Sequence, residues 1–345
     1  MLARRLLVVL PALPALLGSA CISSSILDSN PQTVFLPALE TVPYDSLAGA
    51  KIAFQRFGTL AGNFQGMYVI DAGVPRTQSL LASQALDRGQ LSPDGTKLLF
   101  GGATGQDVSP FDIFIVTLSD SAKTRITSGA VNEEGPSWSP SGTQIFYHIR
   151  GNGLTTLYRQ SPVANAADKV SVVLNDSGGF VWNVDGPLSP NAASRVTFTT
   201  FSQGFRIWAT NIDGSSRVIL KTDPATAGPI FQAPTWSPDG TKIAFLQLGY
   251  DAAGRVTSTT LKTIAPDGTG ETIIALVSTP GTLFGANSVS DFSLCFTGPT
   301  GTRIVFTSLG ADGTSHVYAV RPTGGPITQI TTNSGVWDRG VSCKH

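Results

Sequence analysis

The stretch WSPDGTKIAF at residues 236–245 decides the fold of this chain, because related stretches recur along the sequence. Its Ser-Pro-Asp-Gly core favours a tight turn, since proline presets the backbone at the first central position and aspartate and glycine suit the next ones. The β-branched and aromatic residues that follow indicate a strand. Similar stretches are LSPDGTKLLF (91–100), WSPSGTQIFY (138–147) and LSPNAASRVTF (188–198), with weaker forms at GPTGTRIVF (298–306) and GAKIAF (49–54).

The spacing of these stretches is typical of propeller blades. Their closing aromatic residues lie 46 to 61 residues apart, which includes the usual blade period. A lone four-stranded sheet would expose two apolar faces, whereas a radial arrangement buries each face against a neighbour. We therefore predict an all-β fold over residues 49–345, a six-bladed β-propeller of four-stranded antiparallel blades.

The two ends of the repeat region predict how the ring closes. The first unit begins at its second strand, and the tripeptide Asp-Arg-Gly occurs both at 87–89, before the second unit's turn, and at 338–340. We expect residues 335–343 to supply the inner strand of the first blade. The alternative is that the segment around Tyr44 and Asp45 supplies it, with the C-terminal segment outside the ring.

The N-terminal residues 1–20 are typical of an export signal, with two arginines, an apolar stretch and small residues before Cys21. The pattern resembles a lipoprotein signal peptide, which predicts lipid attachment at Cys21 and a tether over residues 21–48. Ile22, by the same resemblance, favours the outer membrane over the inner. The alternative is ordinary cleavage that leaves Cys21 as a free thiol.

Two further cysteines, Cys295 and Cys343, fall in neighbouring inner strands of the expected ring. An exported protein can form disulfides, so we expect a Cys295–Cys343 bond that pins the ring closure. The alternative is two buried free thiols.

The repeated motif, with its short I-Y/F-V and L/I-T strands, resembles the WD40-like (PD40) repeat of the TolB-type propeller family over about residues 49–343. The resemblance implies the fold but no single function, because such repeats occur in lipoproteins, periplasmic scaffolds, peptidase accessory domains and lyases. TolB carries an α/β domain before its propeller, which the short segment after Cys21 does not accommodate. We therefore expect a relative of TolB and not TolB itself.

Composition argues against several functions. The 23 basic and 23 acidic residues balance, which disfavours nucleic-acid binding. The three histidines, His148, His316 and His345, are scattered without metal-ligand spacing, and no nucleophile, Walker or zinc-protease motif is present. We expect no enzyme activity, metal or cofactor. Asp94 and Asp239 of the turns are expected to bond their own backbone.

Charged residues gather just before the expected inner strands, at one rim of the central channel. Two hypotheses fit them: a binding site for a cationic peptide, a sugar or a metal ion, or a network that joins neighbouring blades. The long insertion at 277–292 is a second candidate contact surface. The rim residues are Asp87, Arg88, Glu133, Glu134, Asp185, Asp291, Asp338 and Arg339.

These features together favour a non-enzymatic, lipid-anchored and monomeric envelope protein. Its propeller would present the channel rim to a protein or to a peptidoglycan-associated partner. One alternative is a receptor for a small ligand or glycan at the channel mouth, and another is an unrecognised hydrolase or lyase.

Overall fold

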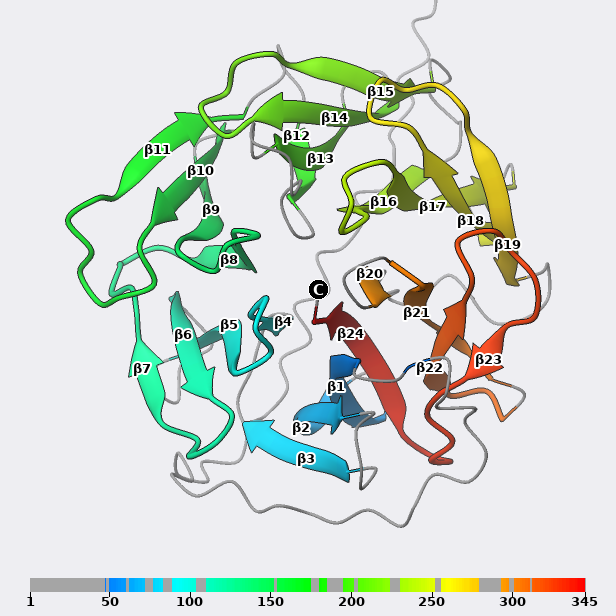
Figure 1. Cartoon of the computed structure of the whole chain (residues 1–345), viewed down its shortest axis with the longest axis horizontal. Helices are drawn as coiled ribbons and strands as arrows, with labels where there is room; N and C mark the ends of the chain where they lie inside the picture. Colours follow the sequence, from blue (N-terminus) through cyan, green and yellow to red (C-terminus); the bar gives the residue numbers. More distant parts are fainter. Residues whose placement is uncertain are drawn as a thin grey trace, which may run out of the picture.

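The strands form six four-stranded antiparallel sheets arranged around a central axis (Figure 1). This confirms the six-bladed propeller. The part of the chain described here contains no apolar helix of membrane-spanning length. The structure is a computed structural model, and it describes residues 47, 50–59, 62–71, 77–82, 89–103, 110–151, 154–174, 180–184, 195–201, 204–223, 230–251, 256–278, 293–297, 301–310 and 312–344.

Each blade runs from an inner strand at the axis to an outer strand at the periphery. The first blade is the exception to chain order, because its inner strand is β24. Blades 1 to 3 consist of β24 (Trp337–Cys343), β1 (Lys51–Thr59), β2 (Gly62–Asp71) and β3 (Thr77–Ala82); β4 (Gln90–Leu91), β5 (Lys97–Ala103), β6 (Phe111–Thr117) and β7 (Lys123–Arg125); and β8 (Glu133–Trp138), β9 (Ile145–Gly151), β10 (Leu154–Gln160) and β11 (Val170–Val173).

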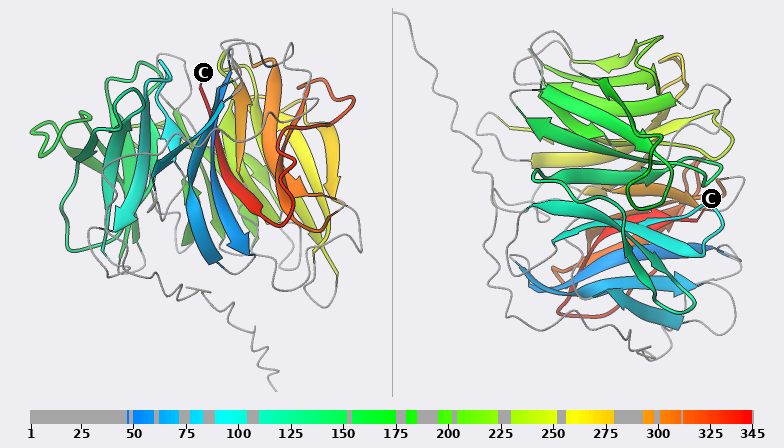
Figure 2. Two further views of the ribbon diagram at one scale, coloured as in Figure 1. Left: turned by 90° about the horizontal axis from the view of Figure 1, so that it is seen from below. Right: turned by 90° about the vertical axis from the view of Figure 1, so that its left-hand side faces the viewer.

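The other three blades follow chain order throughout. The side views in Figure 2 show the blades standing side by side around the axis. Blades 4 to 6 consist of β12 (Phe180–Val184), β13 (Arg195–Phe201), β14 (Phe205–Asn211) and β15 (Val218–Thr222); β16 (Ile230–Trp236), β17 (Ile243–Tyr250), β18 (Val256–Ile264) and β19 (Thr272–Ser278); and β20 (Leu294–Thr297), β21 (Arg303–Leu309), β22 (Ser315–Val320) and β23 (Thr328–Gln329).

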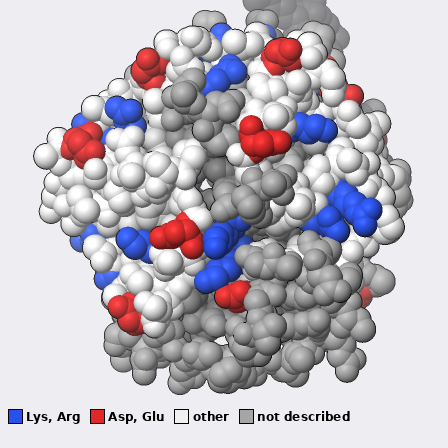
Figure 3. All heavy atoms as spheres, in the orientation of Figure 1, with Lys and Arg blue, Asp and Glu red and all other residues white. Residues whose placement is uncertain are grey.

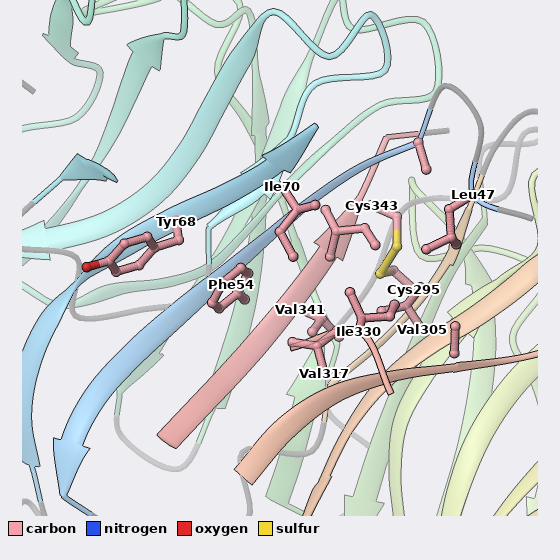
Figure 4. Close-up of a cluster of buried hydrophobic side chains, with 13 residues drawn as sticks. Leu47, Phe54, Tyr68, Ile70, Cys295, Val305, Val317, Ile330, Val341 and Cys343 are labelled. Carbon is pink, nitrogen blue, oxygen red and sulfur yellow. A yellow bond between two sulfur atoms is a disulfide. The ribbon is translucent and has the colours of Figure 1, made fainter. Parts of the chain in front are cut away.

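The hydrophobic core is divided into six clusters, and each lies between two neighbouring blades. The cluster between blades 6 and 1, shown in Figure 4, joins Phe54 and Val341 of blade 1 to Val305 and Val317 of blade 6. Each blade therefore buries both of its faces against its neighbours, which is the arrangement that the repeat predicts.

The closing aromatic residue of each repeat lies on the second strand of its blade, and in five blades it stacks on an aromatic residue of the third strand. Blade 5 is the exception, because there Phe245 lies opposite Lys262 of the third strand and contacts Phe231 of the first strand edge-on. Such pairs contribute about 0.5–1.5 kcal/mol beyond their buried area. The stacked pairs are Phe54–Tyr68, Phe100–Phe114, Tyr147–Tyr158, Phe198–Trp208 and Phe306–Tyr318.

The C-terminal strand closes the ring as predicted. Strand β24 pairs with β1 in antiparallel register, with Ile52 opposite Cys343. The alternative, an inner strand around Tyr44 and Asp45, is therefore wrong. A disulfide joins Cys343 to Cys295 of β20, with the two Cα atoms 5.5 Å apart. Strand β24 is therefore hydrogen-bonded to blade 1 and covalently bonded to blade 6.

The Ser-Pro-Asp-Gly turns have the geometry that their residues predict. The Asp94 carboxylate accepts hydrogen bonds from the Ser92 hydroxyl (2.5 Å) and the Thr96 amide (3.0 Å), which lower the pKa of Asp94. Asp239 makes the equivalent bonds. Gly95 adopts φ of +68°, a conformation that glycine allows without strain. These aspartates serve the turn.

The structure places one of the expected rim residues differently from the sequence prediction. In blade 4 the inner strand ends at Val184, so that Asp185 follows an inner strand instead of preceding one. The insertion lies outside the described residues from 279 to 292.

Removing the ring-closing disulfide should destabilise the protein. The bond spans 48 residues of chain, and closing a loop of that length is worth about 4 kcal/mol in the chain-entropy model. We expect a Cys295→Ser/Cys343→Ser variant to unfold at a clearly lower urea concentration than the wild type. Reductant should lower the wild-type midpoint to that of the variant and leave the variant unchanged; equal midpoints without reductant would contradict the prediction.

Candidate functional site

Three inner strands begin with the same bulged conformation, and it places three polar residues at one level around the channel. Each lies opposite the residue that follows the closing aromatic of its blade. The residue after each has a positive φ, between 51° and 65°. We call the three residues the channel ring: they are Glu134 of β8, Gln232 of β16 and Arg339 of β24.

Asp338, the residue before Arg339, belongs to a buried ion pair. Its carboxylate accepts hydrogen bonds from the Arg56 Nε atom at 2.7 Å and Nη2 atom at 2.9 Å. Both side chains are almost fully buried, and the guanidinium lies over the rings of Phe54 and Tyr68. Asp338 thus joins β24 to β1 within blade 1. The network hypothesis instead expects contacts between neighbouring blades and pairing with a rim arginine.

Arg339 lies among aromatic side chains at the same end of blade 1. Its guanidinium carbon is 5.0 Å from the ring centre of Phe57 and 5.7 Å from that of Trp337. Phe57 also contacts Phe64 edge-on at 5.3 Å. The three rings lie on neighbouring strands, and all four side chains are partly exposed. We call this group, Phe57, Phe64, Trp337 and Arg339, the aromatic patch.

Glu134 lies beside His148 on the opposing strand. The Oε2 atom of Glu134 is 3.5 Å from the Nε2 atom of His148, and the imidazole is buried while the carboxylate is partly exposed. Its neighbour Glu133 is buried on the other face of β8 and contributes no group to the channel ring.

The structure thus separates the rim residues into distinct environments. Asp338 and Glu133 are buried between blades, and Glu134 and Arg339 belong to the channel ring. Figure 3, in the orientation of Figure 1, shows a hollow at the centre of that face, with basic side chains beside it. Asp87, Arg88, Asp185 and Asp291 lie outside the described residues, as does Cys21.

Sequence reasoning missed Gln232 and Arg56. The other two residues of the channel ring, Glu134 and Arg339, are each followed by glycine, whereas Gln232 is followed by Ala233. The sequence around Gln232 therefore does not resemble the other two sites. Arg56 is separated from Asp338 by 282 residues, and only the register of β1 and β24 brings them together.

The two described histidines are both buried. The Nε2 atom of His316 lies 3.0 Å from an Asp312 carboxylate oxygen and 3.2 Å from the Thr314 hydroxyl, within a turn of blade 6. Within the described ranges, no group of three or more His, Cys, Asp or Glu side chains has a metal-binding arrangement.

A family model described as the TolB β-propeller domain matches residues 46–282. The chain belongs to this family. The six blades of this TolB-type propeller agree with that assignment, and the match covers most of the repeat region.

Comparison with individual proteins shows a distant likeness. The uncharacterized protein Atu1656 of Agrobacterium fabrum is 24% identical over 165 residues, which are 45% of this chain and 53% of that protein; the TolB-type chain thus matches about half the length of this curated relative. TolB from Acinetobacter baumannii superposes with a TM-score of 0.65 and 18% identity, over 86% of this chain and 67% of that one. An oligogalacturonate lyase in complex with manganese superposes with a TM-score of 0.53 and 14% identity, over 85% of this chain and 77% of that one. At these identities the structural likenesses show a shared fold.

The Arg56–Asp338 pair should be costly to break from one side. An Asp338→Asn variant leaves the buried guanidinium without a counter-charge, which typically costs about 3–5 kcal/mol. Replacing both residues, as Arg56→Met/Asp338→Leu, should cost less than either single change because no charge stays buried. Urea unfolding of the single and double variants measures the coupling; additive losses would show that the two side chains do not act as a pair.

Proposed function

We propose that this protein is a non-enzymatic lipoprotein of the cell envelope whose propeller binds a protein partner through the channel ring and the aromatic patch. The observation that carries the proposal is the packing of Arg339 over Phe57 and Trp337 next to the channel. Tryptophan and arginine are the residues most enriched among those that dominate binding energy in protein interfaces.

Membership of the TolB-type propeller family supports an interaction scaffold in general terms. The propeller is rigid because both faces of each blade are covered by neighbours, and a rigid scaffold reduces the entropy lost when a partner binds. The opposite charges of Glu134 and Arg339 at one level of the channel would fix the orientation of the partner, since complementary charges give specificity more than affinity.

The partner can be tested by crosslinking and pulldown from envelope membranes. We expect a Trp337→Ala/Arg339→Ala variant to bind the recovered partner at least about 30-fold more weakly, because hot-spot truncations cost about 2 kcal/mol or more. The matched control is Arg217→Ala, which removes an arginine that lies over Phe198 away from the channel. Equal binding by both variants would exclude the aromatic patch as the contact surface.

The lipid anchor is tested separately. A Cys21→Ser change should move the protein from the membrane pellet to the soluble fraction without altering its unfolding midpoint, because it removes only the attachment point of the lipid. Density-gradient separation of inner and outer membranes then tests the expected outer-membrane address of the wild type. Wild-type protein that is soluble after cell breakage would contradict the anchor.

A further inference from the structure

Glu133 occupies the position in blade 3 that Asp338 occupies in blade 1. Asp338 lies opposite Arg56 in the register of β24 with β1, and Glu133 lies opposite Ile149 in the register of β8 with β9. Both acids are almost fully buried, with exposed fractions of 0% and 2%. The blade 1 acid has a bidentate arginine partner, whereas the residue opposite Glu133 is apolar.

The fold itself does not require an acid at this position. In blade 5 the equivalent residue is Phe231, opposite Gln247, and it is 1% exposed. A carboxyl group buried without a cation in contact is costly if it is ionised. Glu133 is therefore an acid at a position that a fully buried aromatic residue fills in another blade.

Burial shifts Glu133 towards the neutral acid. The Thr127 hydroxyl hydrogen-bonds to the carboxyl group, and the Oε2 atom has no hydrogen-bond partner among the described residues. Burial raises the pKa of Glu133, and the charge of Asp112 raises it further. The hydrogen bond from Thr127 and the charges of Lys169 and Arg125 lower it, and the net shift is upward.

The charged groups nearby are already occupied with other partners. Arg125 of β7 forms an ion pair with Asp112 of β6 at 2.7 Å, and the Lys169 ammonium lies 4.6 Å from the ring centre of Tyr158. Glu134 is the neighbour of Glu133 on β8, and His148 of β9 lies beside Glu134. The titratable and charged groups on the elements packed against Glu133 are Asp112, Arg125, Tyr147, Tyr158 and Lys169.

We propose that protonated Glu133 stabilises the contact between blades 2 and 3 and that its ionisation loosens this contact, so that the stability of this part of the ring depends on pH. The sign follows from linkage. A carboxyl whose pKa is raised on folding keeps its proton in the folded protein over a pH range in which the unfolded chain has lost it. Stability is full below the ordinary glutamate pKa of about 4.3 and is lost as the pH rises through the folded value.

A set of four variants tests the proposal by urea unfolding between pH 4 and pH 8. Glu133→Gln stays neutral, so it should match the wild type at pH 4 and exceed it at pH 8. The expected gain in the folding equilibrium constant is about ten-fold for each unit by which folding raises the pKa. Asp338→Asn, at the equivalent position, should lower stability instead, because Arg56 loses its partner.

The position opposite Glu133 gives the second comparison. Ile149→Arg introduces the guanidinium that blade 1 has at Arg56, so it should remove the loss of stability above the ordinary glutamate pKa. Ile149→Met, uncharged and unbranched, should keep that loss. If Ile149→Arg fails to fold, the Glu133→Gln comparison alone decides.

Hydrogen exchange locates the effect. After correction for the intrinsic exchange rate, amides of β8 and β9 should exchange faster at pH 8 than at pH 5 in the wild type, and those of β16 and β17 in blade 5 should not. In Glu133→Gln the difference should vanish. Parallel pH profiles of the wild type and Glu133→Gln, or equal effects of Ile149→Arg and Ile149→Met, would overturn the proposal.

Discussion

Every blade of this protein has two apolar faces, and only its neighbours can cover them. That constraint accounts for the six clusters between blades and for the absence of a single central core in the described structure. It also explains why closure matters more than any one blade, since an open ring would expose an apolar face at each end of the row. The disulfide and the buried Arg56–Asp338 pair both lie at β24, where they hold the two ends together.

The same register position has different chemistry in different blades. In blade 1 it holds a buried ion pair, in blade 3 a buried acid opposite an isoleucine, and in blade 5 a phenylalanine opposite a glutamine. The same buried position thus accepts Asp338, Glu133 and Phe231, which differ in both size and polarity. The polar versions therefore add an electrostatic property to a position that apolar packing could fill.

The repeat made most of the fold predictable, because each Ser-Pro-Asp-Gly turn marks the junction of the first and second strands and each closing aromatic marks the centre of the second. The shared Asp-Arg-Gly tripeptide located the closing strand, and the disulfide followed from placing Cys295 and Cys343 on adjacent inner strands. Contacts set by register could not be predicted in this way. Arg56 meets Asp338 only through the pairing of β1 with β24, and Gln232 joins the channel ring only because Ala233 adopts a positive φ.

The borrowed strand of blade 1 has a consequence for biogenesis. Among the strands that the structure describes, β1 is synthesised first and its partner β24 last. Until then the ring has an unpaired strand edge at β1, of the kind that promotes aggregation. Under the proposed export this delay is useful, because a chain that cannot complete its fold before its final strand arrives stays in the unfolded form that a secretion channel can thread.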